Sequence, residues 1–172
     1  MKIKAALLII LAVGILFVEK KLSLGLVVEV PLFLTYSWLI YSNRKAVAQW
    51  FLASRLPKFI VALVSALPFM LYEENLNCLP TGCLLIPPTI PILTVFVVIM
   101  LLGIKFFKAK NVITPVFLFS IFGVIVENTY GASSVELHAL PFLWMVFFIF
   151  WIFVSYAFFA IIPATVLIEN EY

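Results

Sequence analysis

Residues 112–126 read VITPVFLFSIFGVIV, and residues 141–168 read PFLWMVFFIFWIFVSYAFFAIIPATVLI. The segment between them, 127–140, is polar by comparison and begins with Glu127. A helix of about 20 apolar residues is long enough to cross the hydrocarbon core of a bilayer. The two runs therefore predict a hairpin of membrane-spanning helices, with Glu127 near its polar end.

The composition of the whole chain agrees with this interpretation. Hydrophobic residues make up 66% of the 172 residues and charged residues only 11%. Soluble domains are roughly half apolar and a quarter charged, so the chain is predicted to be a single integral membrane domain, 1–172. The net charge of +3 comes from basic residues in short loops rather than from a basic stripe. Nucleic acid is therefore not an expected partner.

The apolar runs predict an all-α fold, a polytopic membrane bundle of about six transmembrane helices. Residues 45–56 are too polar to span, and their apolar side chains among Arg and Lys predict a short helix lying in the membrane surface. The expected spans are residues 3–18, 22–41, 59–72, 84–107, 112–127 and 139–168.

The distribution of Lys and Arg predicts the orientation of these spans. Cytoplasmic loops of membrane proteins carry an excess of positive residues. With the N-terminus inside, only Lys20 and Lys21 lie outside. We therefore expect a multi-pass protein of the cell membrane with both termini inside, and the cytoplasmic positive residues are Lys2, Lys4, Arg44, Lys45, Arg55, Lys58, Lys105, Lys108 and Lys110.

A short pattern recurs along the chain. Glu74-Asn75 follows one apolar run and Glu127-Asn128 follows another, and each Glu precedes a Pro, Pro88 or Pro141, by the same fourteen residues. The equal spacing predicts repeated helical hairpins. Each unit starts and ends on the inner side, so the repeats would be parallel rather than inverted.

Three glutamates are the candidate functional residues. Glu74 and Glu127 fall at the C-terminal ends of predicted helices, where the helix dipole disfavours a negative charge and so favours the acid that can donate a proton. Glu29 falls within a predicted span, where ionisable groups usually face a cavity or a partner. The alternative is that all three are solvated residues marking the outer water, with Glu29 in a longer loop.

Other residues with reactive side chains form no recognisable site. His138 is the only histidine, and its spacing to Glu127 and Glu136 matches no metal motif, so neither a metal nor a cofactor is expected. The absence of a phosphate-binding loop and of a nucleophile elbow argues against nucleotide-driven pumps and hydrolases. Cys78 and Cys83 flank a Pro-Thr-Gly turn in an outer loop, where we expect a disulfide, with two free thiols as the alternative.

The stretch GVIVENTYG at 123–131, followed by LPFLW at 140–144, resembles small membrane enzymes of carotenoid metabolism, the heterodimer-type lycopene cyclases and the bacterioruberin-pathway carotenoid hydratases. The resemblance covers about residues 59–156. It implies that a carboxylic acid protonates a polyene double bond, with Glu127 and Glu74 at the matching positions and Glu29 as a helper. The cyclases carry a Pro-x-Glu-Glu motif, whereas this chain reads Pro-Thr-Ile-Pro after Ile86-Pro87 and Pro-Phe-Leu-Trp from Pro141.

The expected function is binding of a lipid or isoprenoid in an outward-facing acidic cavity lined by Glu29, Glu74 and Glu127, with acid catalysis at a carbon–carbon double bond. One alternative is a non-catalytic membrane subunit or scaffold that packs against other membrane proteins or a second copy of itself. Another is the substrate-binding subunit of a transporter. Membrane lipids are partners under all three hypotheses.

Overall fold

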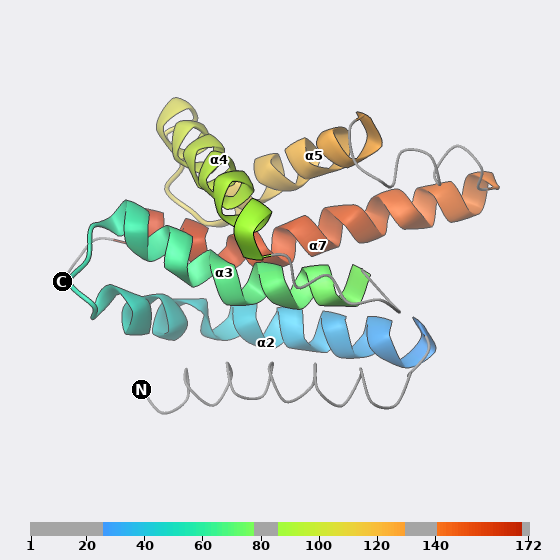
Figure 1. Cartoon of the computed structure of the whole chain (residues 1–172), viewed down its shortest axis with the longest axis horizontal. Helices are drawn as coiled ribbons and strands as arrows, with labels where there is room; N and C mark the ends of the chain where they lie inside the picture. The colour runs from blue at the N-terminus through green and yellow to red at the C-terminus, as the bar shows by residue number, and fades with distance from the viewer. Residues whose placement is uncertain (1–25, 78–85, 130–140, 170–172) are drawn as a thin grey trace.

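The computed structural model describes residues 26–77, 86–129 and 141–169, and every structural statement below concerns these residues (Figure 1). They form helices and no strands, which confirms the all-α prediction. The helices are α2 (Leu26–Leu52), α3 (Lys58–Asn77), α4 (Ile86–Phe106), α5 (Ile113–Thr129) and α7 (Phe142–Ile168).

Helix α7 occupies the centre of the arrangement. It contacts α2, α3, α4 and α5, whereas α5 contacts neither α2 nor α3 within the described residues. In Figure 1, α2 and α3 lie on one side of α7, α5 lies on the other, and α4 is steeply inclined to the rest. The longest and most apolar run in the sequence has therefore become the helix on which the others pack.

The two parts of α7 have different surroundings. From Ile152 to Val166 most side chains are buried, and the ring of Phe158 lies edge-on to Phe33 and Phe69 at centroid distances of 4.9 and 5.7 Å. Edge-to-face pairs at such distances stabilise packing beyond the area that they bury. The first turns are exposed instead, with Phe142 at 71% and Leu143 at 79% of their full accessibility.

Only α7, among the described helices, is long and apolar enough by length and composition to cross a membrane. The predicted span 139–168 thus corresponds to a real helix of suitable length. Shorter apolar helical segments are Lys58–Met70, Leu93–Phe106 and Ile113–Thr129. The span predicted at 3–18 lies outside the described residues.

The structure differs from the sequence prediction at residues 45–56. We expected a separate surface helix there, but residues 45–52 are the last turns of α2, which is continuous from Leu26 to Leu52. Polar side chains at the expected break bond to the backbone of the same helix: Asn43 Nδ2 donates to the carbonyl of Leu39, and one terminal nitrogen of Arg44 donates to that of Tyr41. The chain turns later, at Arg55, which has φ of 58°.

Replacement of Phe158 by Ala should destabilise the protein strongly. The side chain is 1% exposed and contacts rings from two other helices, and loss of a buried Phe side chain typically costs about 3–5 kcal/mol. The matched control is Phe142→Ala on the exposed part of the same helix. Unfolding of the detergent-solubilised protein, followed by tryptophan fluorescence, should show a large loss for the first variant only. Equal losses would contradict the central position of α7.

Candidate functional site

Glu127 lies in the last turn of α5, and its side chain is held by α7. The hydroxyl of Tyr156 donates a hydrogen bond of 2.9 Å to Glu127 Oε1. Tyr156 itself is largely buried, with its ring 5.2 Å from that of Phe159 and 5.8 Å from that of Phe96. The carboxylate therefore meets a fixed hydroxyl at the edge of an aromatic core.

Gly123 makes this approach possible. It lies one helical turn before Glu127, on the same face of α5. A Cβ atom at Gly123 would lie 2.1 Å from Cδ1 of Tyr156, so any larger residue would collide with the ring. The sequence reasoning identified Glu127 but missed Gly123 and Tyr156. A Gly one turn before an acidic residue was the available signal, since Gly in a helix often marks a close approach.

Two buried polar atoms belong to residues that adjoin Glu127 and Tyr156 in the sequence. Asn128 Oδ1 and Ser155 Oγ have no hydrogen-bond partner among the described residues. A buried polar atom without a partner typically costs about 1–3 kcal/mol, so native structures contain few of them. Asn128 directly follows Glu127 and Ser155 directly precedes Tyr156, so buried polar atoms adjoin both members of this hydrogen-bonded pair in the chain.

The other two candidate glutamates lie at helix ends on the same side of the structure. Glu74 is in the last turn of α3 and Glu29 is in the first turn of α2, and these two ends lie together in Figure 1. Their side chains are outside the described part of the structure, so the predicted convergence of all three glutamates remains a prediction. Helix α7 lies between α5 and the α2–α3 pair.

Several predicted features fall on residues that the structure does not describe. The disulfide between Cys78 and Cys83 is one, and it therefore stays a prediction. Glu136 and His138 are also outside the described residues. Within the described ranges, no three His, Cys, Asp or Glu residues lie together as a metal site would require.

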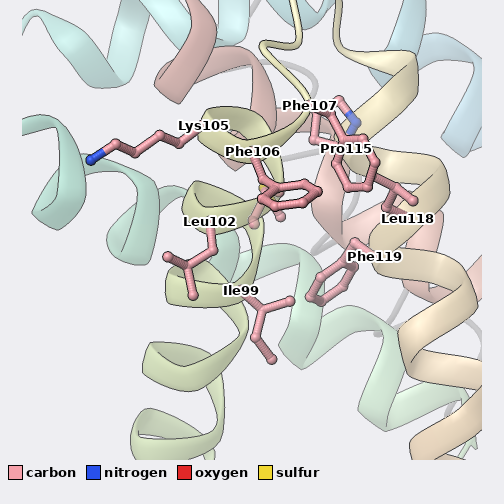
Figure 2. Close-up of a pocket in the computed structure, with 10 residues that line it drawn as sticks. Ile99, Leu102, Lys105, Phe106, Phe107, Pro115, Leu118 and Phe119 are labelled. Atoms are coloured by element: carbon pink, nitrogen blue, oxygen red, sulfur yellow. The ribbon is translucent and has the colours of Figure 1, made fainter.

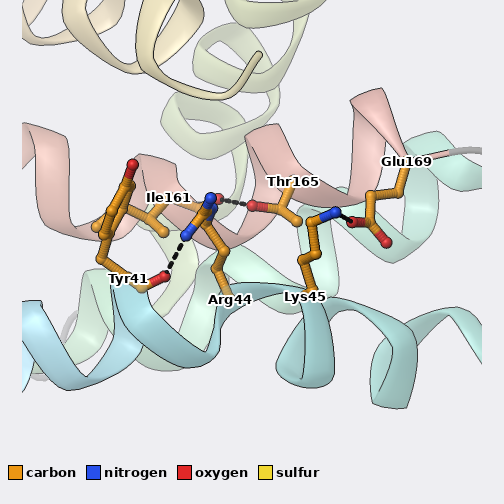
Figure 3. A network of polar contacts seen from close by, with 6 residues as sticks. All are labelled: Tyr41, Arg44, Lys45, Ile161, Thr165 and Glu169. Carbon is orange, nitrogen blue, oxygen red and sulfur yellow. Dashed lines mark hydrogen bonds and ion pairs between the residues drawn. The ribbon is translucent and has the colours of Figure 1, made fainter. Parts of the chain in front are cut away.

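The opposite end of α7 is held by basic residues (Figure 3). Lys45 of α2 forms an ion pair of 3.4 Å with Glu169, and Lys58 Nζ of α3 donates a hydrogen bond of 2.6 Å to the backbone carbonyl of Glu169. Arg44 stacks over the ring of Tyr41 at 4.2 Å. The Lys45 side chain is 72% exposed, and ion pairs with such an exposed partner are individually weak, so we assign this end a positioning role rather than a large stability contribution.

Comparison with protein-family models, with curated proteins and with solved structures finds no match for this chain. The resemblance to carotenoid-modifying membrane enzymes therefore gains no support from a relative. Any functional assignment depends on the geometry described above, in particular on the Glu127–Tyr156 contact.

Two glycines provide a matched test of the α5–α7 contact. Gly123→Ala should destabilise the protein by about 1–3 kcal/mol, because the new methyl group collides with the ring of Tyr156. Gly103→Ala in α4 should stabilise it by up to about 1 kcal/mol, because nothing lies within 4 Å of a Cβ there and Ala favours helix. Thermal unfolding of both variants measures the two shifts. A stabilising effect of Gly123→Ala would show that the ring of Tyr156 does not lie against Gly123 as described.

Proposed function

We propose that the chain is a multi-pass protein of the cell membrane with about six spans and an inside N-terminus. The distribution of charge supports this orientation. Helices α3 and α5 both run antiparallel to α7, and each begins beside basic residues and ends beside a glutamate. The basic residues in the described part, which the positive-inside rule would assign to the cytoplasm, are Arg44, Lys45, Arg55, Lys58, Lys105, Lys108 and Lys110.

The hydrogen bonds of Ser and Thr side chains within the helices support a membrane location as well. Thr35, Ser37, Ser120 and Thr165 each donate to the carbonyl four residues earlier in their own helix. A hydroxyl satisfied in this way does not need water, which the bilayer core does not supply. The exposed side chains of α4, α5 and α7 include large apolar ones, among them Leu102, Phe117, Ile125 and Phe147.

At the end that carries Glu127, we propose a binding site for a lipid or isoprenoid. The observation that carries this proposal is the hydrogen bond between Tyr156 and Glu127, a fixed acid–hydroxyl pair beside aromatic side chains. The aromatic rings suit an apolar chain, and the pair suits a polar or reacting group. Glu74 and Glu29 are proposed to line the same cavity from the ends of α3 and α2.

The reaction that this pair suits best is acid catalysis at a carbon–carbon double bond. The carboxylic acid of Glu127 would transfer its proton to one carbon, leaving a carbocation on the other. Water would add to the cation and return a proton to the carboxylate, or a second double bond of the substrate would add before a proton is lost. The hydroxyl of Tyr156 would stabilise the carboxylate formed in the first step.

A second function is favoured by a separate observation. The first turns of α7 expose Phe142, Leu143 and Trp144, which are contiguous in the chain. Clustered large apolar side chains at a membrane surface suit contact with another membrane protein. A non-catalytic subunit of a larger complex, or of a transporter, would use this part of α7, and would not require Glu127 to react.

The membrane topology can be tested independently of any ligand. Reporter fusions after residues 55, 109 and 135 should place the first two inside and the third outside, because basic loops remain in the cytoplasm. Alkaline extraction should leave the protein in the membrane fraction. Release of the protein by alkali would exclude the multi-pass proposal.

The catalytic proposal predicts that Glu127→Gln removes activity, because the amide cannot donate the acid proton. Lipid extracts of membranes containing this variant should accumulate an unsaturated precursor that is consumed when the wild-type protein is present. Tyr156→Phe should reduce turnover by about 10–100-fold through loss of one hydrogen bond to the carboxylate, at roughly 1.5–3 kcal/mol.

The control for this experiment is Glu169→Gln, which makes the same change of charge at the opposite end of α7. Glu74→Gln and Glu29→Gln test whether the three glutamates share one cavity, since each should then alter the same lipid. An unchanged lipid profile in Glu127→Gln at normal protein abundance would favour the non-catalytic subunit.

A further inference from the structure

A groove of about 600 Å³ lies between the C-terminal half of α4 and the first half of α5 (Figure 2). Its volume is within the range of small-molecule sites, about 300–1,000 Å³. The groove is at the start of α5, whereas Glu127 is in the last turn of that helix. Its apolar walls include Ile99, Leu102 and Phe106 from α4 and Pro115, Leu118 and Phe119 from α5.

Three basic residues lie in or directly after the part of α4 that lines this groove. Lys105 lines it, and Lys108 and Lys110 follow directly in the connection between α4 and α5. All three side chains are exposed, and within the described residues none forms an ion pair. Figure 2 shows the amine of Lys105 extending from α4 on the side away from α5.

The backbone keeps these lysines close together. Helix α4 ends in a tight turn in which Lys108 has φ of 48° and the amide of Ala109 donates to the carbonyl of Ile104 at 3.0 Å. This left-handed turn reverses the chain within a few residues. The connection that carries Lys108 and Lys110 thus directly follows Phe107, which lines the groove.

We propose that the groove binds an anionic glycerophospholipid, with an acyl chain along the apolar walls and the head group at Lys105, Lys108 and Lys110. A purely apolar ligand would leave the lysines unused, and a free anion would leave the groove unused. Basic residues beside a helix–helix groove at the cytoplasmic face are suited to anionic head groups. The inference rests on the proposed membrane location, but is independent of any chemistry at Glu127.

The experiment is lipid titration of the full-length protein in detergent, read by native mass spectrometry. The probes are phosphatidylglycerol and phosphatidylcholine with identical acyl chains. The wild-type protein should bind phosphatidylglycerol at least about tenfold more tightly. The triple variant Lys105→Gln, Lys108→Gln, Lys110→Gln should lose this preference, and Arg55→Gln, a basic residue in the α2–α3 connection, should keep it.

A second variant tests the groove itself. Gly103 lines the groove and nothing lies within 4 Å of a Cβ there, so the side chain of Gly103→Leu starts in open space and should fill part of the groove. It should weaken binding of both lipids while leaving the unfolding temperature unchanged or higher. If Gly103→Leu does not fold, the lysine variant, which changes exposed side chains only, still decides the charge preference.

Equal binding of the two lipids by the wild-type protein would overturn the proposal, as would equal loss of preference in Arg55→Gln and the triple lysine variant. Unchanged binding of both lipids to folded Gly103→Leu would exclude the groove. Failure of the membrane proposal is recognised separately, because alkaline extraction would then release the protein. A protein that resists extraction yet shows no preference refutes the lipid site alone.

Discussion

The structure depends on burial of one half of α7 among the other helices. From Ile152 to Val166 this helix supplies the side chains against which α2, α3, α4 and α5 pack. Aromatic rings carry much of the contact, with Phe158 facing α2 and α3 and Phe159 facing α4 and α5. Aromatic pairs prefer a few relative geometries, so these contacts favour one position along α7 and one rotation about its own axis for each neighbouring helix.

Small and polar residues then differentiate the two ends of this core. Gly123 lets α5 approach the ring of Tyr156, and that approach places the hydroxyl of Tyr156 on Glu127. At the other end, Lys45 and Lys58 from two different helices meet at Glu169. The acidic candidate site and this basic contact thus lie at opposite ends of one packed core.

The sequence predicted the helices better than their packing. Apolar runs located α4 and α7 to within three residues at each end, because length and composition suffice to recognise such helices. The prediction of a separate surface helix at 45–56 was wrong. The polar stretch that includes Asn43 and Arg44 suggested that the preceding helix ends there, but these side chains bond to carbonyls of α2 and the helix continues. Tyr156 was missed because its role depends on contact with α5, which no local pattern encodes.

The central helix is also the last of the described helices along the chain. During synthesis, α2, α3, α4 and α5 would emerge before the helix that covers their shared surfaces has been made. The hydroxyl groups of Thr35 in α2 and Ser120 in α5 bond within their own helices, so in the proposed membrane location they need no hydrogen-bond partner from α7. Assembly of the described bundle therefore has to wait until α7 has been synthesised, and a chain cut short before Phe142 would leave α2, α3, α4 and α5 without the helix on which they all pack, with only their contacts to one another remaining.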